Sequence, residues 1–153
     1  MKNAWGPLSF LMAFLVFIAY AHPQIGSNAA PALATTARAT ISELPATFIG
    51  VLPCADCPGI RYQLNLLPNH AFVSRMIYEE RAGRFDERGR WQLTSDGKTL
   101  VLQGKRGETE KFAVRAGGVL RKLDINGHGI DSGLNYDLKR APKFTPIEIP
   151  TEK

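Results

Sequence analysis

Two cysteines separated by two residues are the part of this sequence best suited to chemistry. Cys54 and Cys57 are the only cysteines of the chain, and they lie in the stretch Pro53–Gly59 (PCADCPG). A Cys-x-x-Cys pair can close a disulfide, hold a metal ion or exchange disulfides with another protein. Each of these functions needs different surroundings, so the neighbouring residues decide between them.

Disulfide exchange and zinc binding are the two functions that the neighbouring residues favour least. An exchanging pair of the thioredoxin type lies at the N-terminus of a helix, whose dipole lowers the pKa of the first thiol. Here Pro58 and Gly59 lead instead into an alternating, strand-like segment. Structural zinc usually takes four ligands, and the remaining candidates, His70 and His128, fall in distant turn segments.

A structural disulfide and a copper(I) site both remain open for Cys54 and Cys57. In an oxidising compartment, a disulfide that stiffens the loop is the resting expectation. Copper(I) is a soft ion that two thiolates satisfy at low coordination number, so a reduced fraction of the protein could bind it. Asp56, between the two cysteines, is more typical of a turn-forming residue than of a metal ligand.

No arrangement typical of an enzyme occurs in the sequence. The chain contains no Gly-x-Ser-x-Gly, phosphate-loop or His-Glu-x-x-His motif, and its serines and acids form no recognisable nucleophile group. The net charge of +5 is mild and the Lys and Arg residues are scattered, whereas nucleic-acid binding gathers them on one face. We therefore expect a protein that is not an enzyme and binds no nucleic acid.

The first 21 residues have the features of an export signal. Lys2 precedes the apolar run Leu8–Tyr20, and Ala19 and Ala21 supply the small residues that a signal peptidase reads. The run has 13 residues, whereas a membrane-spanning helix needs about 20. Because no cysteine lies near the cleavage site, we expect a periplasmic protein with neither a lipid anchor nor a stable membrane insertion.

Composition divides the rest of the chain into three parts. Residues 22–46 are rich in Ala, Thr and Pro and lack apolar periodicity, which predicts a flexible linker. Residues 47–140 carry the regular pattern and are long enough for one modest core. Residues 141–153 contain three prolines and are predicted to trail over the surface as a C-terminal tail.

Alternation of apolar and polar residues predicts β-strands throughout residues 47–140. Turn signals such as Asp96-Gly97 and Asn126-Gly127 separate the alternating runs. We predict eight strands, at about 47–52, 60–67, 71–79, 84–94, 98–103, 109–116, 118–124 and 134–140. Sequential short strands pair antiparallel, so the predicted fold class is all-β, a small antiparallel up-and-down barrel, with an open two-sheet sandwich as the alternative.

The same alternation predicts which side chains point into the barrel. They are Trp91, Leu93, Leu100, Leu102, Phe112, Val114, Tyr136 and Leu138. A barrel of this size is filled by side chains or holds one small ligand, and the sequence leaves both possibilities open.

The segment 48–60 (FIGVLPCADCPGI) resembles the opening of the N-terminal domain of the copper-resistance lipoprotein family NlpE, with its pattern G-x-(L/Y)-P-C-A-D-C-x-G-I. Similar short stretches follow at Gly89–Leu93 and Asp96–Leu100, and the resemblance extends over residues 47–140. It implies a lipocalin-like barrel in the bacterial envelope, linked to copper tolerance and to sensing of envelope stress. Cys54 and Cys57 match the family's cysteine pair, which is proposed to bind copper or to form a disulfide.

Together these features predict a periplasmic protein that binds Cu(I), or senses copper or envelope stress, through Cys54 and Cys57, with an envelope stress-signalling protein as its partner. The alternative is a non-catalytic barrel that carries a small apolar ligand or docks onto a partner. In that alternative the disulfide is purely structural.

Overall fold

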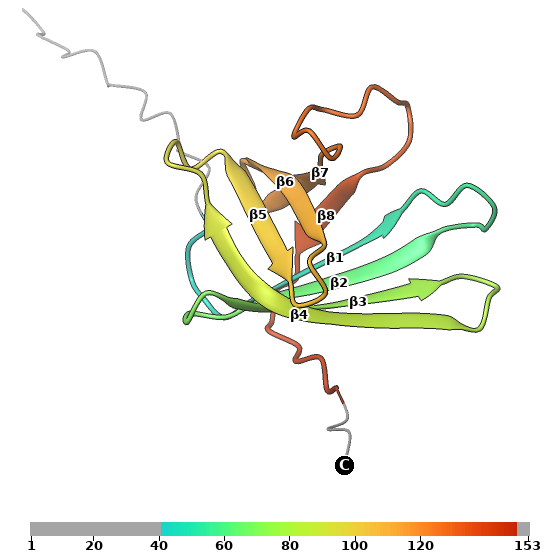
Figure 1. Cartoon of the computed structure of the whole chain (residues 1–153), viewed down its shortest axis with the longest axis horizontal. Coiled ribbons are helices and arrows are strands. Elements are labelled where there is room, and N and C mark those ends of the chain that lie inside the picture. Colours follow the sequence, from blue (N-terminus) through green and yellow to red (C-terminus); the bar gives the residue numbers. More distant parts are fainter. Residues whose placement is uncertain (1–40, 150–153) are drawn as a thin grey trace, which may run out of the picture. The chain divides into compact units, whose positions relative to one another are not determined.

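The computed structural model describes residues 41–149 as an antiparallel barrel (Figure 1). The strands are β1 (Ala46–Leu52), β2 (Ile60–Leu66), β3 (Ala71–Tyr78), β4 (Gly83–Leu93), β5 (Thr99–Gly104), β6 (Thr109–Arg115), β7 (Val119–Lys122) and β8 (Asp137–Arg140). Each strand pairs with its neighbours in sequence, and β1 also pairs with β8, so the sheet closes on itself. The prediction of an all-β up-and-down barrel is confirmed, and the sandwich alternative is wrong.

The predicted export signal (residues 1–21) and residues 22–40 of the predicted linker lie outside the described residues. The end of that linker belongs to the folded unit, because Ile41 and Leu44 pack against the core and Ala46 opens β1. Local composition could not show this, since the contacts are made with distant strands. Between residues 41 and 149 there is no helix long and apolar enough to cross a membrane.

The last strand is where the sequence prediction differs most from the structure. β8 begins at Asp137 instead of residue 134, and Leu134 is 58% exposed. The Asn135 side chain donates to the Val51 carbonyl oxygen at 2.9 Å and accepts from the Asp137 backbone N–H at 3.2 Å. The Asn135 side chain therefore makes hydrogen bonds that backbone groups would make in a continued strand. Tyr136, predicted to point inward, lies half-buried in the loop before β8.

Every second residue of the strands points into the barrel, as the alternation predicts. The buried apolar cluster consists of Ala46, Phe48, Leu52, Tyr62, Leu64, Leu66, Phe72, Trp91, Leu100, Leu102, Phe112, Leu120 and Leu138. Leu93 and Val114 pack against it and are partly buried, so the predicted inward set is confirmed except at Tyr136. Burial of each large apolar side chain contributes about 1.5–3 kcal/mol, which makes this cluster the main source of stability.

The barrel is open at one end, where the first half of β4 pairs with β3 but not with β5. β4 pairs with β3 from Gly83 to Arg90 but with β5 only from Gly89 to Leu93. In Figure 1, β2, β3 and β4 extend well beyond β5 and β6 at this end. A Cβ atom on Gly89 would lie 1.9 Å from the Gln103 carbonyl oxygen. Glycine thus allows the close approach of β4 to β5 at the point where the two strands separate.

Residues 141–149, here called the C-terminal strap, lie across the outer face of β1 to β4. Their carbonyl groups accept hydrogen bonds from outward-facing side chains: Thr145 from Thr47, Gln63 and Asn65, Glu148 from Arg75, and Ile149 from Arg88. Within the strap, the Ile147 side chain is buried, with 9% exposed. Residues 141–149 of the tail predicted to trail over the surface are therefore fixed to that surface, and residues 150–153 lie outside the described part of the chain.

The substitution Trp91→Ala is expected to lower the free energy of unfolding by about 3–5 kcal/mol, through lost burial and the cavity left behind. Trp91 is 6% exposed, and its indole N–H donates to the Leu67 carbonyl oxygen at 3.0 Å. Urea denaturation measures the change. Gln92→Ala, an exposed neighbour on the same strand, should shift stability by less than about 0.5 kcal/mol. An unchanged midpoint for Trp91→Ala would contradict the inward placement of its side chain.

Candidate functional site

Cys54 and Cys57 lie in the β1–β2 loop, residues 53–59, at the open end of the barrel. The structure joins them in a disulfide with an S–S distance of 2.04 Å and a Cα–Cα distance of 5.3 Å. Both cysteines are partly exposed, and the two residues between them are exposed. The loop therefore presents a small closed ring to solvent, within reach of a reductant, a metal ion or a partner.

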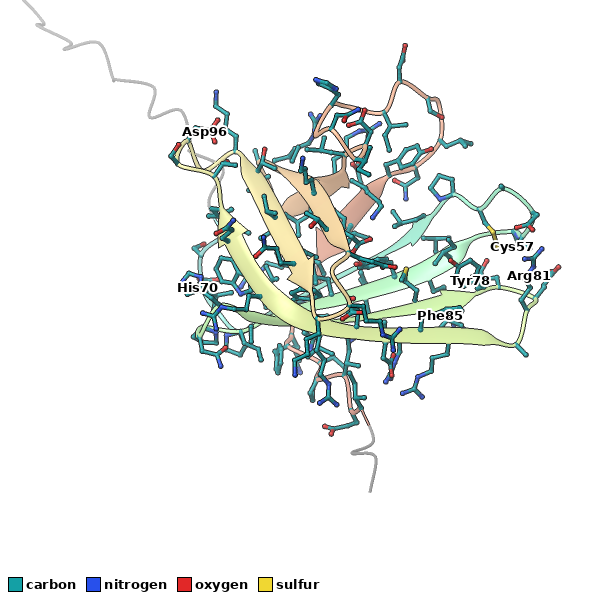
Figure 2. All side chains as sticks on the ribbon, in the orientation of Figure 1. Cys57, His70, Tyr78, Arg81, Phe85 and Asp96 are labelled. Atoms are coloured by element: carbon teal, nitrogen blue, oxygen red, sulfur yellow. A yellow bond between two sulfur atoms is a disulfide. The ribbon has the colours of Figure 1, made fainter. Side chains whose placement is uncertain are left out.

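The disulfide loop is attached to the β3–β4 turn beside it. Arg81 Nη2 lies 2.6 Å from Asp56 Oδ2 and also donates to the Asp56 carbonyl oxygen at 3.0 Å. The Glu79 backbone N–H donates to the Gly59 carbonyl oxygen at 2.9 Å. Figure 2 shows Arg81 and Cys57 at the same end of the molecule. We call residues 53–59 and 79–82 together the disulfide ledge.

Neither described histidine lies in the disulfide ledge. His70 is in the β2–β3 turn at the opposite end of the barrel, where its ring centre lies 4.6 Å from that of Trp91 (Figure 2). His128 is in the β7–β8 loop, and its Nδ1 lies 3.7 Å from Asp124 Oδ2. Within residues 41–149, no group of three or more His, Cys, Asp or Glu residues is arranged to hold a metal ion. A metal bound at the ledge would therefore depend on the two cysteines.

A polar cluster inside the barrel was not identified from the sequence. The Tyr62 hydroxyl and the Lys122 ammonium both donate to the Glu110 carboxylate, and Lys122 Nζ lies 5.0 Å from the centre of the Phe112 ring. Burial, and then the negative charge of Glu110, raise the pKa of the Tyr62 hydroxyl well above its ordinary value. Strand parity could have revealed this cluster, since Glu110 lies two residues before Phe112 and shares its inward face.

The interior next to this polar cluster has little free space. A cavity lined by Phe72, Ser74, Met76, Glu87, Leu102, Gly104, Glu108 and Glu110 has a volume of about 10 Å³. A single water needs about 10–15 Å³ on this measure. The side chains of the barrel fill this part of the interior themselves, so it offers no room for a small apolar ligand.

The fold and the ledge together define a small β-barrel domain with a disulfide-closed loop at its open end. Residues 48–133 match the family model described as the NlpE N-terminal domain. This match covers more than half of the chain, and the chain therefore belongs to the NlpE family.

One relative compared by sequence and two solved structures, one of them also NlpE of Escherichia coli, show the extent of the similarity. Lipoprotein NlpE of Escherichia coli (strain K12) is 34% identical over 118 residues, which cover 75% of this chain and 49% of the relative. The chain thus spans about half the length of this curated relative. The crystal structure of the Cpx pathway activator NlpE from Escherichia coli has a TM-score of 0.52 and 34% identity, covering 65% of this chain and 51% of that one. A candidate lipoprotein from Shewanella oneidensis has a TM-score of 0.55 and 31% identity, covering 65% of this chain and 90% of that one.

The substitution Arg81→Ala is expected to speed reduction of the disulfide, because Asp56 loses the ion pair and hydrogen bond that restrain the loop. The two side chains are 49% and 65% exposed, so the free energy of unfolding should change by at most about 1 kcal/mol. The reduction rate in dithiothreitol, followed by thiol labelling, measures the effect. Arg115→Ala, at the opposite end of the barrel, is the matched control. Equal rates in wild type and both variants would show that Arg81 does not restrain the loop.

Tyr62 is expected to ionise well above the ordinary pKa of a tyrosine in an alkaline titration. Its raised pKa in the folded state means that its hydroxyl contributes stability fully present below the unfolded pKa of about 10. That contribution is lost as pH rises through the folded pKa, because the unfolded state ionises first. Ultraviolet titration and unfolding against pH measure both effects. Tyr62→Phe should remove this part of the alkaline loss of stability, and an unchanged profile would show that Tyr62 does not cause it.

Proposed function

We propose that this chain is a non-catalytic stress-signalling domain of the bacterial envelope, with the disulfide ledge as its sensing element. The observation that carries the proposal is the exposed Cys54–Cys57 ring, which is bonded to a neighbouring turn instead of being buried in the core. A relative at 34% identity is described as a Cpx pathway activator, which supports a role in signalling. The features of residues 1–21 support export to the periplasm by a cleaved signal.

Copper(I) is the ion that the ledge would sense. Two electrons and two protons from a dithiol reductant open the disulfide to two thiols. Loss of the thiol protons then gives two soft thiolates, which suit Cu(I) better than hard divalent ions. Cys54 Sγ lies 3.6 Å from Asp56 Oδ1, so a carboxylate adds negative charge beside the ion. With a Cα–Cα distance of 5.3 Å, the pair can hold an ion of low coordination number without a large movement of the loop.

The hydrogen bonds of the disulfide ledge also connect the two cysteines to a surface that a partner can recognise. Asp56 and Gly59 are bonded to the β3–β4 turn, and the strands that this turn joins carry Tyr78 and Phe85 at the same end of the barrel (Figure 2). Reduction or copper binding changes the charge and the sulfur geometry of the loop, and the contact between Arg81 and Asp56 links that change to the turn. A signalling protein bound at this end would respond to it.

A docking domain with a purely structural disulfide is the second candidate function. The aromatic pair of Phe85, 50% exposed, and Tyr78 beside the ledge favours it, because contiguous apolar groups on a surface mark contacts with other molecules. The version in which the barrel carries an apolar ligand lacks comparable support, since the interior cavity near Ser74 holds about 10 Å³.

The reduced chain is expected to bind one Cu(I) per molecule in competition with a chromophoric Cu(I) chelator. Cys54→Ser and Cys57→Ser should each abolish this binding and keep the fold, because the barrel core does not include the loop. Reduction alone should cost less than the roughly 3 kcal/mol assigned to a disulfide that closes a 15-residue loop, as measured by thermal unfolding.

His70→Ala and His128→Ala are the matched controls and should keep full affinity for Cu(I). Folded cysteine variants that still bind the ion would place the copper site elsewhere. Cysteine variants that unfold would show a structural disulfide and favour the docking candidate. The signalling role is tested in cells that carry a Cpx-pathway reporter. If expression of the wild-type chain does not activate the reporter, the signalling role is contradicted.

A further inference from the structure

The outer half of β4 has a free edge. The Arg88 carbonyl faces β5 and accepts a hydrogen bond from the Lys105 backbone N–H at 2.9 Å. Alternate residues of an antiparallel strand face the same side, so the backbone groups of Arg84 and Asp86 also face away from β3. Pairing of β4 with β5 ends at Gly89, and no other strand in the described part of the chain reaches beyond it. Figure 1 shows this half of β4 as the outermost strand.

An aromatic pair, with one exposed member, lies beside this edge. Phe85 is 50% exposed, and its ring packs edge-on against Tyr78, with 5.5 Å between the ring centres. Figure 2 places both residues on the extended part of the sheet. A free strand edge next to an exposed apolar side chain is the arrangement that accepts an added strand.

The sequence along the edge is complementary to itself. When two copies of Arg84-Phe85-Asp86 run antiparallel about Phe85, each Arg84 lies opposite Asp86 of the other copy. Directly opposed charges of opposite sign stabilise a strand pair, whereas like charges destabilise it. The Arg75 guanidinium, 2.6 Å from the Asp86 carboxylate, holds the pKa of that carboxyl well below its usual range. Asp86 therefore stays charged when the edges meet.

We propose that two copies of this chain associate through their β4 edges, antiparallel, with the two-fold axis at Phe85. Arg84 and Asp86 then form the hydrogen-bonded pairs, which exchange four backbone hydrogen bonds in the dimer. The two Phe85 residues form the central non-hydrogen-bonded pair, where side chains approach most closely. The result is a continuous sheet in the order β3, β4, β4, β3.

The turns at either side of the edge fit the same register. Lys105, Arg106 and Glu108 lie in the β5–β6 turn, and the Lys105 backbone N–H bonds to Arg88, opposite which β4 of the second copy begins. The β3–β4 turn that precedes this strand carries Glu79, Glu80 and Arg81. A turn with a formal charge of −1 in each copy therefore approaches a turn with a formal charge of +1 in the other, once on each side of the axis. This complementarity favours a second copy over an unrelated strand, which has no reason to carry the same order of charges.

Cross-linking at the axis tests the geometry. Phe85→Cys places two cysteines at a non-hydrogen-bonded position with Cα atoms about 4.5 Å apart, within the range of a disulfide. With diamide as oxidant, the Phe85→Cys chain should form a covalent dimer much faster than Gln92→Cys, an exposed control on the part of β4 that pairs with β5. Equal rates for the two variants would overturn the proposal, as would cross-links of Phe85→Cys to other proteins alone.

Removal of one edge donor tests the hydrogen bonds. Sedimentation equilibrium should show a concentration-dependent dimer for the wild-type chain. Arg84→Pro deletes an N–H that faces the free edge and not β3, so the barrel should fold, as circular dichroism checks. Losing two hydrogen bonds per dimer should raise the Kd about tenfold or more, while Arg84→Lys keeps both donor and charge and should keep the dimer. A monomeric wild type up to about 1 mM, or a dimer that Arg84→Pro leaves unchanged, would overturn the proposal.

Discussion

The barrel depends on a short seam between its first and last strands. β1 and β8 share the pairs Phe48 with Arg140 and Ile49 with Lys139, and the Ala141 backbone N–H extends the seam to the Thr47 carbonyl oxygen at 2.8 Å. Without this seam the inward side chains of eight strands would not face one another, and the sheet would keep two free edges. The Arg140 guanidinium strengthens the seam, because it donates to the carbonyl groups of Ser42 and Glu43.

The fold could be predicted from the sequence because strand periodicity is a local property. In β2, Tyr62 and Leu64 alternate with Arg61 and Gln63, and such a run shows its strand, its faces and its turn signals within a few residues. The contacts that the sequence could not show are those between distant positions. Asn65 bonds to a carbonyl group 80 residues away, in the C-terminal strap. No local pattern marks that carbonyl as an acceptor.

The candidate site was predictable to the same extent. The spacing of Cys54 and Cys57 identifies the loop from the sequence alone, but Arg81, which restrains it, lies 25 residues from Asp56 and joins it only through the pairing of β1 to β4. The interior cluster was missed for a different reason. Glu110 and Lys122 have the right parity to face inward, yet charged residues are usually assigned to the outer face, and their mutual pairing offsets the cost of their partial burial.

The C-terminal strap also determines how the domain would bear a mechanical load. If the chain ran directly from β8 into solvent, a force on it would break the hydrogen bonds between β8 and β1 one at a time. The strap instead passes the force first to Ile149 and Glu148, whose carbonyl groups are held by side chains of β4 and β3, and then to Thr145, whose carbonyl group is held by side chains of β1 and β2. These anchors on four strands bear the load before it reaches the seam. The strap therefore protects the closure of the barrel against force applied from the C-terminal side.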